Sequence, residues 1–359
     1  MKYAFTNGKI LDGSRDMQVH TGRCILVKNG KIHDIVSDTT DLSGYTKIDL
    51  KGRYILPGLI NMHVHLAGSG KPQKKQRDNE KLVNTIMSTS LTRAIAYRMV
   101  ADFAKDELLS GVTTIRTVGG LGDFDTRLRD EIKAGSKIGP RILASNQGIS
   151  VPGGHMAGSV AVAASSIPDA LSHLKKSEQQ KVDLIKLMIT GGVLDAKEKG
   201  VPGELKMPPE MVRAVCEKAH ADGYLVAAHV ESPEGVRVAL ENGVDSIEHG
   251  AKLTDEMVKL FKERGAFLCT TISPALPYAL FDRSITNATK RSAELTDIDS
   301  ITGSIEKGKA ADLIVTAQNP LKDLKALRNL EMVISGGRLI EQPKIKKRKQ
   351  VEAELDKFL

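Results

Sequence analysis

The chain has 359 residues, of which 41% are hydrophobic, and a formal net charge of +8 at pH 7. This composition excludes an intrinsically disordered chain, because it supplies enough apolar surface for a large core. The length suits two or three average domains, or one α/β barrel with an appendage. Apolar runs have strand length, and the opening MKYAFTNGK lacks the apolar core of a signal peptide. We therefore expect no membrane segment and a cytoplasmic location.

Much of the positive charge lies in two short segments, residues 71–77 and 344–349. Aromatic residues form only 4% of the chain and none interrupts these segments, so the stacking surface of a single-strand binder is missing. We expect solvated charge and no nucleic-acid partner. Cys24, Cys216 and Cys269 are far apart in apolar surroundings, which indicates reduced, buried thiols rather than disulfides.

Both ends of the chain have the pattern of short strands separated by turns. In residues 1–56, Asn-Gly pairs at 7–8 and 29–30 separate apolar runs, which is the strongest short hairpin signal. Residues 302–343 repeat this pattern. Because isolated hairpins are only marginally stable, we expect the two ends to join in one composite β-sandwich domain. Residues 344–359 are expected to form a basic C-terminal helix or tail.

Residues 57–301 alternate strands with helices, which is typical of a parallel sheet. Helical patterns are expected at 79–109, 168–178, 209–221, 236–240 and 255–262. Expected strands cover 54–66, 111–118, 141–145, 182–189, 225–229, 244–249 and 266–272. Seven strands are close to a barrel, so the predicted fold class is α/β, a (β/α)8 TIM-like barrel that is incomplete because no eighth strand is visible.

Four histidines fall at the carboxyl ends of expected strands. His63 and His65 end the first strand and share one face of it, while His229 and His249 end the fifth and sixth. In a barrel these strand ends meet at one mouth, so the pattern predicts a metal site. His155 lies on a glycine-rich loop after the third strand, where it either contacts substrate or is an ordinary loop histidine.

Lys186 stands inside an apolar strand that both faces of the sheet should cover, where an uncompensated ammonium is costly. An ammonium has no lone pair and cannot ligate a cation. Carbamylation by carbon dioxide would turn this side chain into a carboxylate able to bridge two cations. The alternative is a lysine whose ammonium reaches solvent at the barrel mouth.

These features resemble the amidohydrolase superfamily, in particular its imidazolonepropionase-like and Xaa-Pro or Xaa-Arg dipeptidase-like enzymes. The matching segments are 56–65, 111–116, 185–188 with Gly191-Gly192, 228–229, 246–250 and 303–315. Nearly the whole chain is covered. These motifs identify the superfamily specifically, but they say little about which substrate the protein would hydrolyse.

The resemblance implies roles for individual residues. His63 and His65 would bind one divalent ion, His229 and His249 the other, and carbamylated Lys186 would bridge them. Two cations roughly 3.5–4 Å apart would hold a hydroxide that attacks an amide carbonyl. Lys186, His229 and His249 would thus be catalytic. Zinc is the first expectation, although manganese and iron suit the same ligands, and the substrate would be a small amide or dipeptide.

The family pattern also has an aspartate at the end of an eighth strand, and this sequence lacks it. The interval from Ser273 to Ile301 is too short for a helix, a strand and another helix at ordinary barrel lengths, so we expect an internal deletion. Asp282, Asp297 and Asp299 are the local substitutes, of which the last two fall in a turn. An incomplete barrel exposes two strand edges and so favours either association into a homo-oligomer or instability. Two hypotheses follow: a metal-dependent amidohydrolase, or an impaired amidohydrolase-like scaffold without turnover.

Overall fold

A computed structural model describes residues 1–68, 78–192, 203–271 and 287–345. Contacts within the chain divide it into two compact units. Unit 1 comprises Met1–Asn61, Ala104–Ile115 and Ser273–Leu359, and unit 2 comprises Met62–Phe103 and Arg116–Ile272.

Unit 1 is rich in β-structure. Its four-stranded sheet has the order β5-β4-β1-β6, with β1 Lys2–Thr6, β4 Arg23–Lys28, β5 Lys31–Ser37 and β6 Thr46–Asp49. Its six-stranded sheet has the order β19-β18-β17-β7-β2-β3, with β2 Lys9–Leu11, β3 Val19–His20, β7 Tyr54–Pro57, β17 Leu313–Thr316, β18 Leu330–Ser335 and β19 Arg338–Glu341.

The pairing of β7 with β17 joins the two chain ends in one sheet, because these strands run antiparallel with Leu313 opposite Pro57. Both ends also contribute to one buried cluster that includes Phe5, Ile25 and Ile334. The hairpin between β4 and β5 turns at Asn29 and Gly30 with φ of 52° and 78°. Positive φ at both positions suits the tight hairpin turn that Asn-Gly favours, so this hairpin is confirmed.

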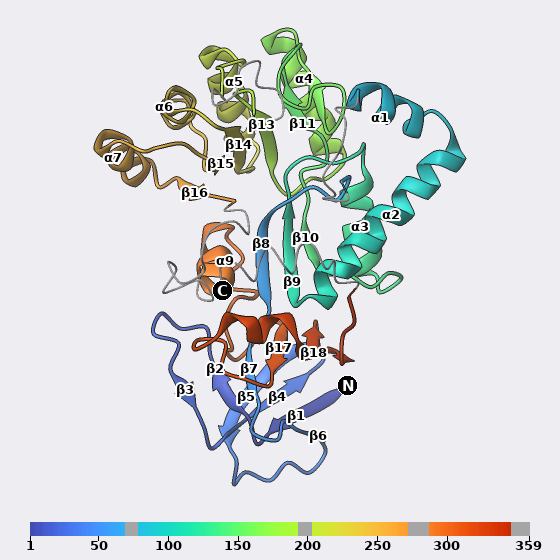
Figure 1. The fold of residues 1–359 in the computed structure, drawn as a ribbon, viewed down its shortest axis with the longest axis vertical. Helices are drawn as coiled ribbons and strands as arrows, with labels where there is room; N and C mark the ends of the chain where they lie inside the picture. The colour runs from blue at the N-terminus through green and yellow to red at the C-terminus, as the bar shows by residue number, and fades with distance from the viewer. Residues whose placement is uncertain (69–77, 193–202, 272–286, 346–359) are drawn as a thin grey trace. The chain divides into compact units, whose positions relative to one another are not determined.

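Unit 2 alternates strands with helices (Figure 1). One sheet, whose strands β8 and β9 include residues of both units, has the order β10-β9-β8, with β8 Leu59–Val64, β9 Val112–Thr117 and β10 Arg141–Leu143. A six-stranded sheet has the order β12-β11-β13-β14-β15-β16, with β11 Gly148–Ser150, β12 Ala161–Ala163, β13 Ile185–Met188, β14 Val226–Val230, β15 Ser246–His249 and β16 Phe267–Cys269. Strands β13 to β16 pair in parallel in chain order.

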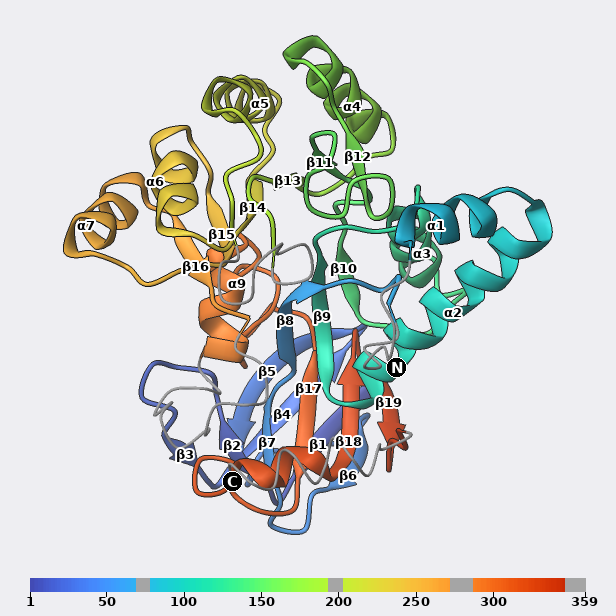
Figure 2. The same ribbon diagram turned by 45° about the horizontal axis from the view of Figure 1, so that its top comes forward.

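Four helices of unit 2 lie outside the six-stranded sheet (Figure 2). They are α4 Ile167–Gln179, α5 Pro209–Ala221, α6 Pro233–Glu241 and α7 Asp255–Arg264, whereas α3 Phe124–Lys133 packs beside β10. Hydroxyl N-caps begin three of them, since Ser166, Ser232 and Thr254 each accept a backbone N–H of the first turn. Every residue of β13 and β14 is buried, as expected for strands with both faces covered.

The amphipathic stretch 79–109 forms two helices, α1 Asn79–Met87 and α2 Ser90–Leu109. Hydroxyl groups between them account for the break: Ser88 Oγ donates to the Thr85 carbonyl, and Thr89 Oγ1 accepts the Thr92 N–H. These bonds end one helix and cap the next. None of the described helices is both long and apolar enough to cross a membrane.

Strands β11 and β12 were not expected, because each has only three residues. They flank the glycine-rich loop that carries His155. At the other end of the chain, Asn287–Arg291 forms a π-helical turn that continues into α9 Ser292–Leu295. Among the described residues between α9 and β17 no strand forms. Residues 272–286 lie outside the described part, so the eighth strand and its loss stay predictions.

Candidate metal centre

His63 and His65 are two residues apart on β8, and both rings are held by their Nδ1 atoms. His63 Nδ1 lies 2.7 Å from Glu248 Oε2, and His65 Nδ1 lies 3.0 Å from the carbonyl oxygen of Gly119. A carbonyl can only accept, and Glu248 carries a pKa below its usual range. Both Nδ1 atoms therefore carry the proton, which leaves both Nε2 atoms as lone-pair donors to a metal.

The two Nε2 atoms lie 3.2 Å apart. Converging lone pairs repel unless a cation or a shared proton lies between them. Burial, followed by His63, lowers the pKa of His65 to about 3, and burial lowers the pKa of His63, so protonation is disfavoured. Two nitrogens bound to one tetrahedral zinc ion at 2.0–2.1 Å are roughly 3.3 Å apart. This pair therefore fits a metal ion.

His229 ends β14, and His249 ends β15 with φ of 70°. The His249 ring lies between two others, with centroids 4.7 Å from those of His63 and His229. Its Nδ1 is 2.6 Å from Thr271 Oγ1, a hydroxyl that donates to the Thr270 carbonyl. That hydroxyl must accept from His249, which leaves the His249 Nε2 lone pair available.

The pKa values of this second pair of rings are also low. Burial and then His155 lower the pKa of His229, whose Nε2 lies 3.2 Å from the Gly191 carbonyl. Burial and then His63 lower the pKa of His249 to about 3. The structure therefore brings the four predicted histidines together as neutral rings, the state that ligates a metal.

Lys186 lies on β13 and is 2% exposed. Its Nζ has no hydrogen-bond partner among the described residues. Burial lowers the pKa of Lys186 to about 8, with Glu248 opposing that shift and Arg116 adding to it. The Lys186 ammonium therefore does not reach solvent. The predicted alternative, a lysine whose ammonium is exposed at the barrel mouth, is wrong.

A buried ion-pair network that the sequence pattern did not predict lies beside these ligands. Glu248 Oε1 accepts from Arg116 Nη2 at 2.6 Å and from Ser246 Oγ at 2.5 Å. Arg116 Nε also donates to the Met62 carbonyl at 2.8 Å. Burial alone would raise the pKa of Glu248, but Arg116, His63 and Lys186 together lower it. Glu248 is a charged residue inside a buried strand, which is the same sequence pattern that singled out Lys186.

His155 is 8% exposed and stacks on His229, with ring centroids 3.9 Å apart and an interplanar angle of 10°. Gly192 leaves room for both rings, since a Cβ there would lie 2.8 Å from His155 Cε1 and 3.0 Å from His229 Nε2. The predicted substrate-binding residue therefore contacts a candidate ligand directly.

Cys269 differs from the sequence expectation. It is partly exposed and lies opposite Glu248 in the pairing of β15 with β16. Burial and then Glu248 raise the pKa of Cys269 to about 12. The expected apolar surroundings are wrong for this thiol, because parallel register places it beside a carboxylate. Cys24 and Cys216 are buried, and all three cysteines are free.

Two carboxylates of the described part lie next to the histidines. Two groups of side chains have possible ligand atoms within 4.8 Å of one another. One is His63, Glu248 and Cys269, and the other is His229, Glu231 and His249. The proposed substitute Asp282 lies outside the described residues. Asp297 has φ of 56° and lies with Asp299 in the turn after α9, as expected.

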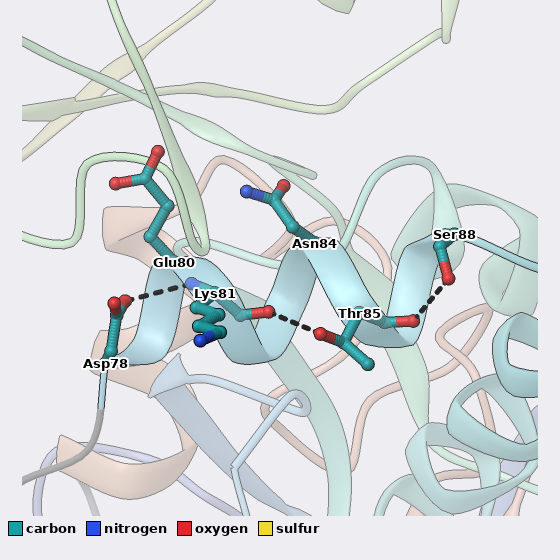
Figure 3. Close-up of a pocket in the computed structure, with 6 residues that line it drawn as sticks. All are labelled: Asp78, Glu80, Lys81, Asn84, Thr85 and Ser88. Carbon is teal, nitrogen blue, oxygen red and sulfur yellow. Dashed lines mark hydrogen bonds between the residues drawn. The ribbon is translucent and has the colours of Figure 1, made fainter.

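A shallow hollow lies along α1 and holds none of these residues (Figure 3). Its lining is polar, but Asp78 accepts the Lys81 N–H and Thr85 Oγ1 donates to the Lys81 carbonyl. Ser88 likewise donates to the helix backbone. These groups stabilise the helix ends, so the hollow adds no chemistry to the site.

The chain matches known proteins over much of its length. Residues 54–280 match the family model described as the amidohydrolase family. An ochratoxinase of Aspergillus niger is 23% identical over 243 residues, covering 61% of this chain and 48% of that protein. An imidazolonepropionase of Klebsiella pneumoniae is 36% identical over 112 residues, which is 27% of each chain. The chain thus spans about half the length, or less, of these curated relatives.

Among solved structures, a Xaa-Pro dipeptidase with bound methionine in its active site is 27% identical. The match covers 95% of this chain and all of that one, with a TM-score of 0.79. The fold is therefore a TIM-barrel-type α/β fold with a β-rich domain, as predicted. The chain belongs to the amidohydrolase family, within the branch that includes imidazolonepropionases and Xaa-Pro dipeptidases.

Proposed function

We propose that this chain is a metal-dependent amidohydrolase that hydrolyses a carbon–nitrogen bond of a small amide or dipeptide. The observation that carries the proposal is the pair of Nε2 atoms of His63 and His65, 3.2 Å apart, whose Nδ1 protons are both engaged. Such a pair suits a cation and little else. The family and the dipeptidase relative support the reaction class.

The ligand assignment follows the two pairs of histidines. His63 and His65 would hold one ion, His229 and His249 a second, and carbamylated Lys186 would bridge the two. The ions would supply a Lewis acid for the amide carbonyl and lower the pKa of the attacking water. Zinc is the first candidate, because imidazole and carboxylate ligands suit it.

Lys186 can undergo carbamylation because its pKa of about 8 leaves part of the amine neutral near physiological pH. The nitrogen lone pair forms a bond to the carbon of carbon dioxide, one electron pair of a C=O bond moves to oxygen, and the nitrogen loses a proton. The product is an anion. It would replace the positive charge of Lys186 with a negative charge beside the buried ion pair of Arg116 and Glu248.

His155 is the proposed substrate contact. Its ring packs face to face on His229, so a substrate bound beside His229 would meet this imidazole. We also propose the division of the chain into a composite β-sandwich of residues 1–56 and 302–343, a barrel of residues 57–301 and a basic tail of residues 344–359. The loss of strand eight and its aspartate belongs to the same proposal, and the scaffold without turnover is its alternative.

The test is hydrolysis by purified protein of a panel of Xaa-Pro and Xaa-Arg dipeptides and hydantoins, with and without a chelator. The proposal expects chelator-sensitive release of product from at least one substrate class. His229→Ala should lose this activity, whereas His20→Ala, a surface histidine paired with Asp12, should keep it. Metal-replete protein that is inactive across the panel would favour the scaffold.

A further inference from the structure

We infer that Glu248, held by Arg116, is a positioning residue that fixes the tautomer and ring orientation of His63 for metal binding. The inference rests on the proposed function, because it concerns the ion held by His63 and His65. Glu248 itself would not need to touch the substrate. Its carboxylate is fully buried, and its two oxygens face different partners.

One oxygen of Glu248 accepts a hydrogen bond from the His63 ring. Oε2 lies 2.7 Å from His63 Nδ1, so the carboxylate accepts the Nδ1 proton. A neutral imidazole carries a single N–H, and placing it on Nδ1 leaves Nε2 free of hydrogen. That lone pair is the one that faces His65 Nε2. Without an acceptor at Nδ1, the ring could carry its proton on Nε2 and lose its ligand atom.

The other oxygen anchors the carboxylate to the protein. Oε1 accepts from Arg116 Nη2 at 2.6 Å and from Ser246 Oγ at 2.5 Å. Arg116 Nε donates at 2.8 Å to the carbonyl of Met62, the residue before His63. The Arg116 guanidinium thus fixes both the backbone before His63 and the Glu248 carboxylate that hydrogen-bonds to the His63 ring. A lysine has no planar fork and cannot hold both contacts in this way.

Among the described residues, the rings of the other three histidines make no hydrogen bond to a buried carboxylate. The Nδ1 proton of His65 goes to the Gly119 carbonyl, and His229 Nε2 lies beside the Gly191 carbonyl. His249 donates to the Thr271 hydroxyl. Loss of the Glu248 carboxylate should therefore affect the ion held by His63 and His65 and spare the ion held by the other pair.

Glu248→Gln makes the test sharp, because an amide has one accepting and one donating end. If the oxygen keeps Arg116, the amide N–H faces His63 Nδ1 and forces the proton onto Nε2. If the amide turns over, its N–H meets the Arg116 guanidinium. The first arrangement removes the acceptor of the His63 Nδ1 proton, and the second keeps that acceptor but loses the bond that fixes it to Arg116. Glu107→Gln is the control, because Glu107 is a partly buried carboxyl whose Oε2 accepts a hydrogen bond from Asn61.

The measurement is equilibrium dialysis of chelator-treated protein against zinc alone, with metal counted by mass spectrometry. Wild-type protein and Glu107→Gln should show both sites. Glu248→Gln should weaken one site by about 10- to 100-fold and leave the other unchanged. In a His63→Ala background Glu248→Gln should cause no further loss, because the two residues act through one ligand.

Nitrogen NMR of histidine-labelled, metal-free protein gives an independent readout. The proton of His63 should lie on Nδ1 in wild type and move to Nε2 in Glu248→Gln. If that variant lacks the native circular dichroism spectrum, Arg116→Lys is measured instead and should weaken the same site. Unchanged zinc binding and an unchanged tautomer would overturn the inference alone. Wild-type protein that binds no zinc would overturn the proposed function, and the inference with it.

Discussion

Lys186 shows how much chemistry a single residue can reveal. A charged side chain inside an apolar strand must be neutralised or paired, and the structure leaves its Nζ buried without a hydrogen-bond partner in the described part. The same reasoning would have found Glu248, which is equally buried within β15. It could not have named Arg116 as the partner, because that pairing depends on how β9 and β15 lie in space.

We predict that Lys186→Met folds and loses the bridging charge. Methionine fills the same volume without an amine, so activity should fall by about 100-fold or more and at least one ion should bind more weakly. Protein supplied with ¹³C-bicarbonate should show a carbamate carbon signal that the variant lacks. Lys206→Met is the control, since Lys206 pairs with Glu204 outside the histidine cluster. A wild-type activity in Lys186→Met would refute the bridge.

Asp125 gives a prediction for stability against pH. It is 1% exposed, one carboxylate oxygen has no hydrogen-bond partner in the described part, and burial raises its pKa from 3.8 to about 6. The folded state therefore binds a proton more tightly than the unfolded state. Protonated Asp125 does not destabilise the fold below about pH 4. As the pH rises through about 6 the buried carboxyl ionises, and the free energy of unfolding falls by about 3 kcal/mol.

Asp125→Asn should remove this cost. The variant should be more stable than wild type in urea unfolding at pH 7.5, and the advantage should shrink steadily between pH 6 and pH 4. Asp130→Asn, which changes an exposed aspartate on the same helix, should show little effect. An advantage for Asp125→Asn that is the same at pH 4.5 and pH 7.5 would contradict the argument.

At the level of elements, periodicity and turn chemistry located most of unit 2. The helix expected at 209–221 has those bounds, and the strand expected at 182–189 contains β13. Local pattern could not find β11 and β12, since three-residue strands exist only through pairing. Nor could it find the loop carbonyls of Gly119 and Gly191, because any residue type offers a carbonyl.

The loop after β13 gives a matched pair of glycine variants. A methyl group on Gly192 would press on the His155 and His229 rings, whereas one on Gly191 would meet its nearest atom, a backbone oxygen, at 3.9 Å. Gly192→Ala should therefore lower activity by about 10-fold or more, and Gly191→Ala should have little effect. Steady-state kinetics and zinc content check this. Equal effects of the two variants would argue against the stacked arrangement.

At the scale of the whole molecule, strand-helix alternation predicted the α/β class, and the family match supports a TIM-barrel-type fold. Composition and motifs could not decide whether an eighth strand forms, because closure of a barrel depends on long-range pairing. The segment in question, residues 272–286, lies outside the described residues. The deletion and the missing aspartate therefore remain predictions for experiment.

Metal binding should stabilise the folded chain. Ions that bind only the native state add about 4 kcal/mol at a thousandfold excess over the Kd. Removing them with a chelator should lower Tm on the order of 5 °C or more, measured by scanning calorimetry. The double variant His63→Ala/His229→Ala should show no chelator-dependent shift. A shift as large as that of wild type would mean that the ions bind elsewhere.

The central claim is that this histidine cluster is the metal centre of a working hydrolase. Zinc titration of turnover in chelator-treated protein tests it most directly, with the substrate that the panel identifies. Turnover should be absent at first, rise with added zinc and level off near two ions per chain, with His63→Ala failing to recover. Turnover that never appears at any zinc concentration, or that persists in chelator-treated protein without metal, would contradict the account.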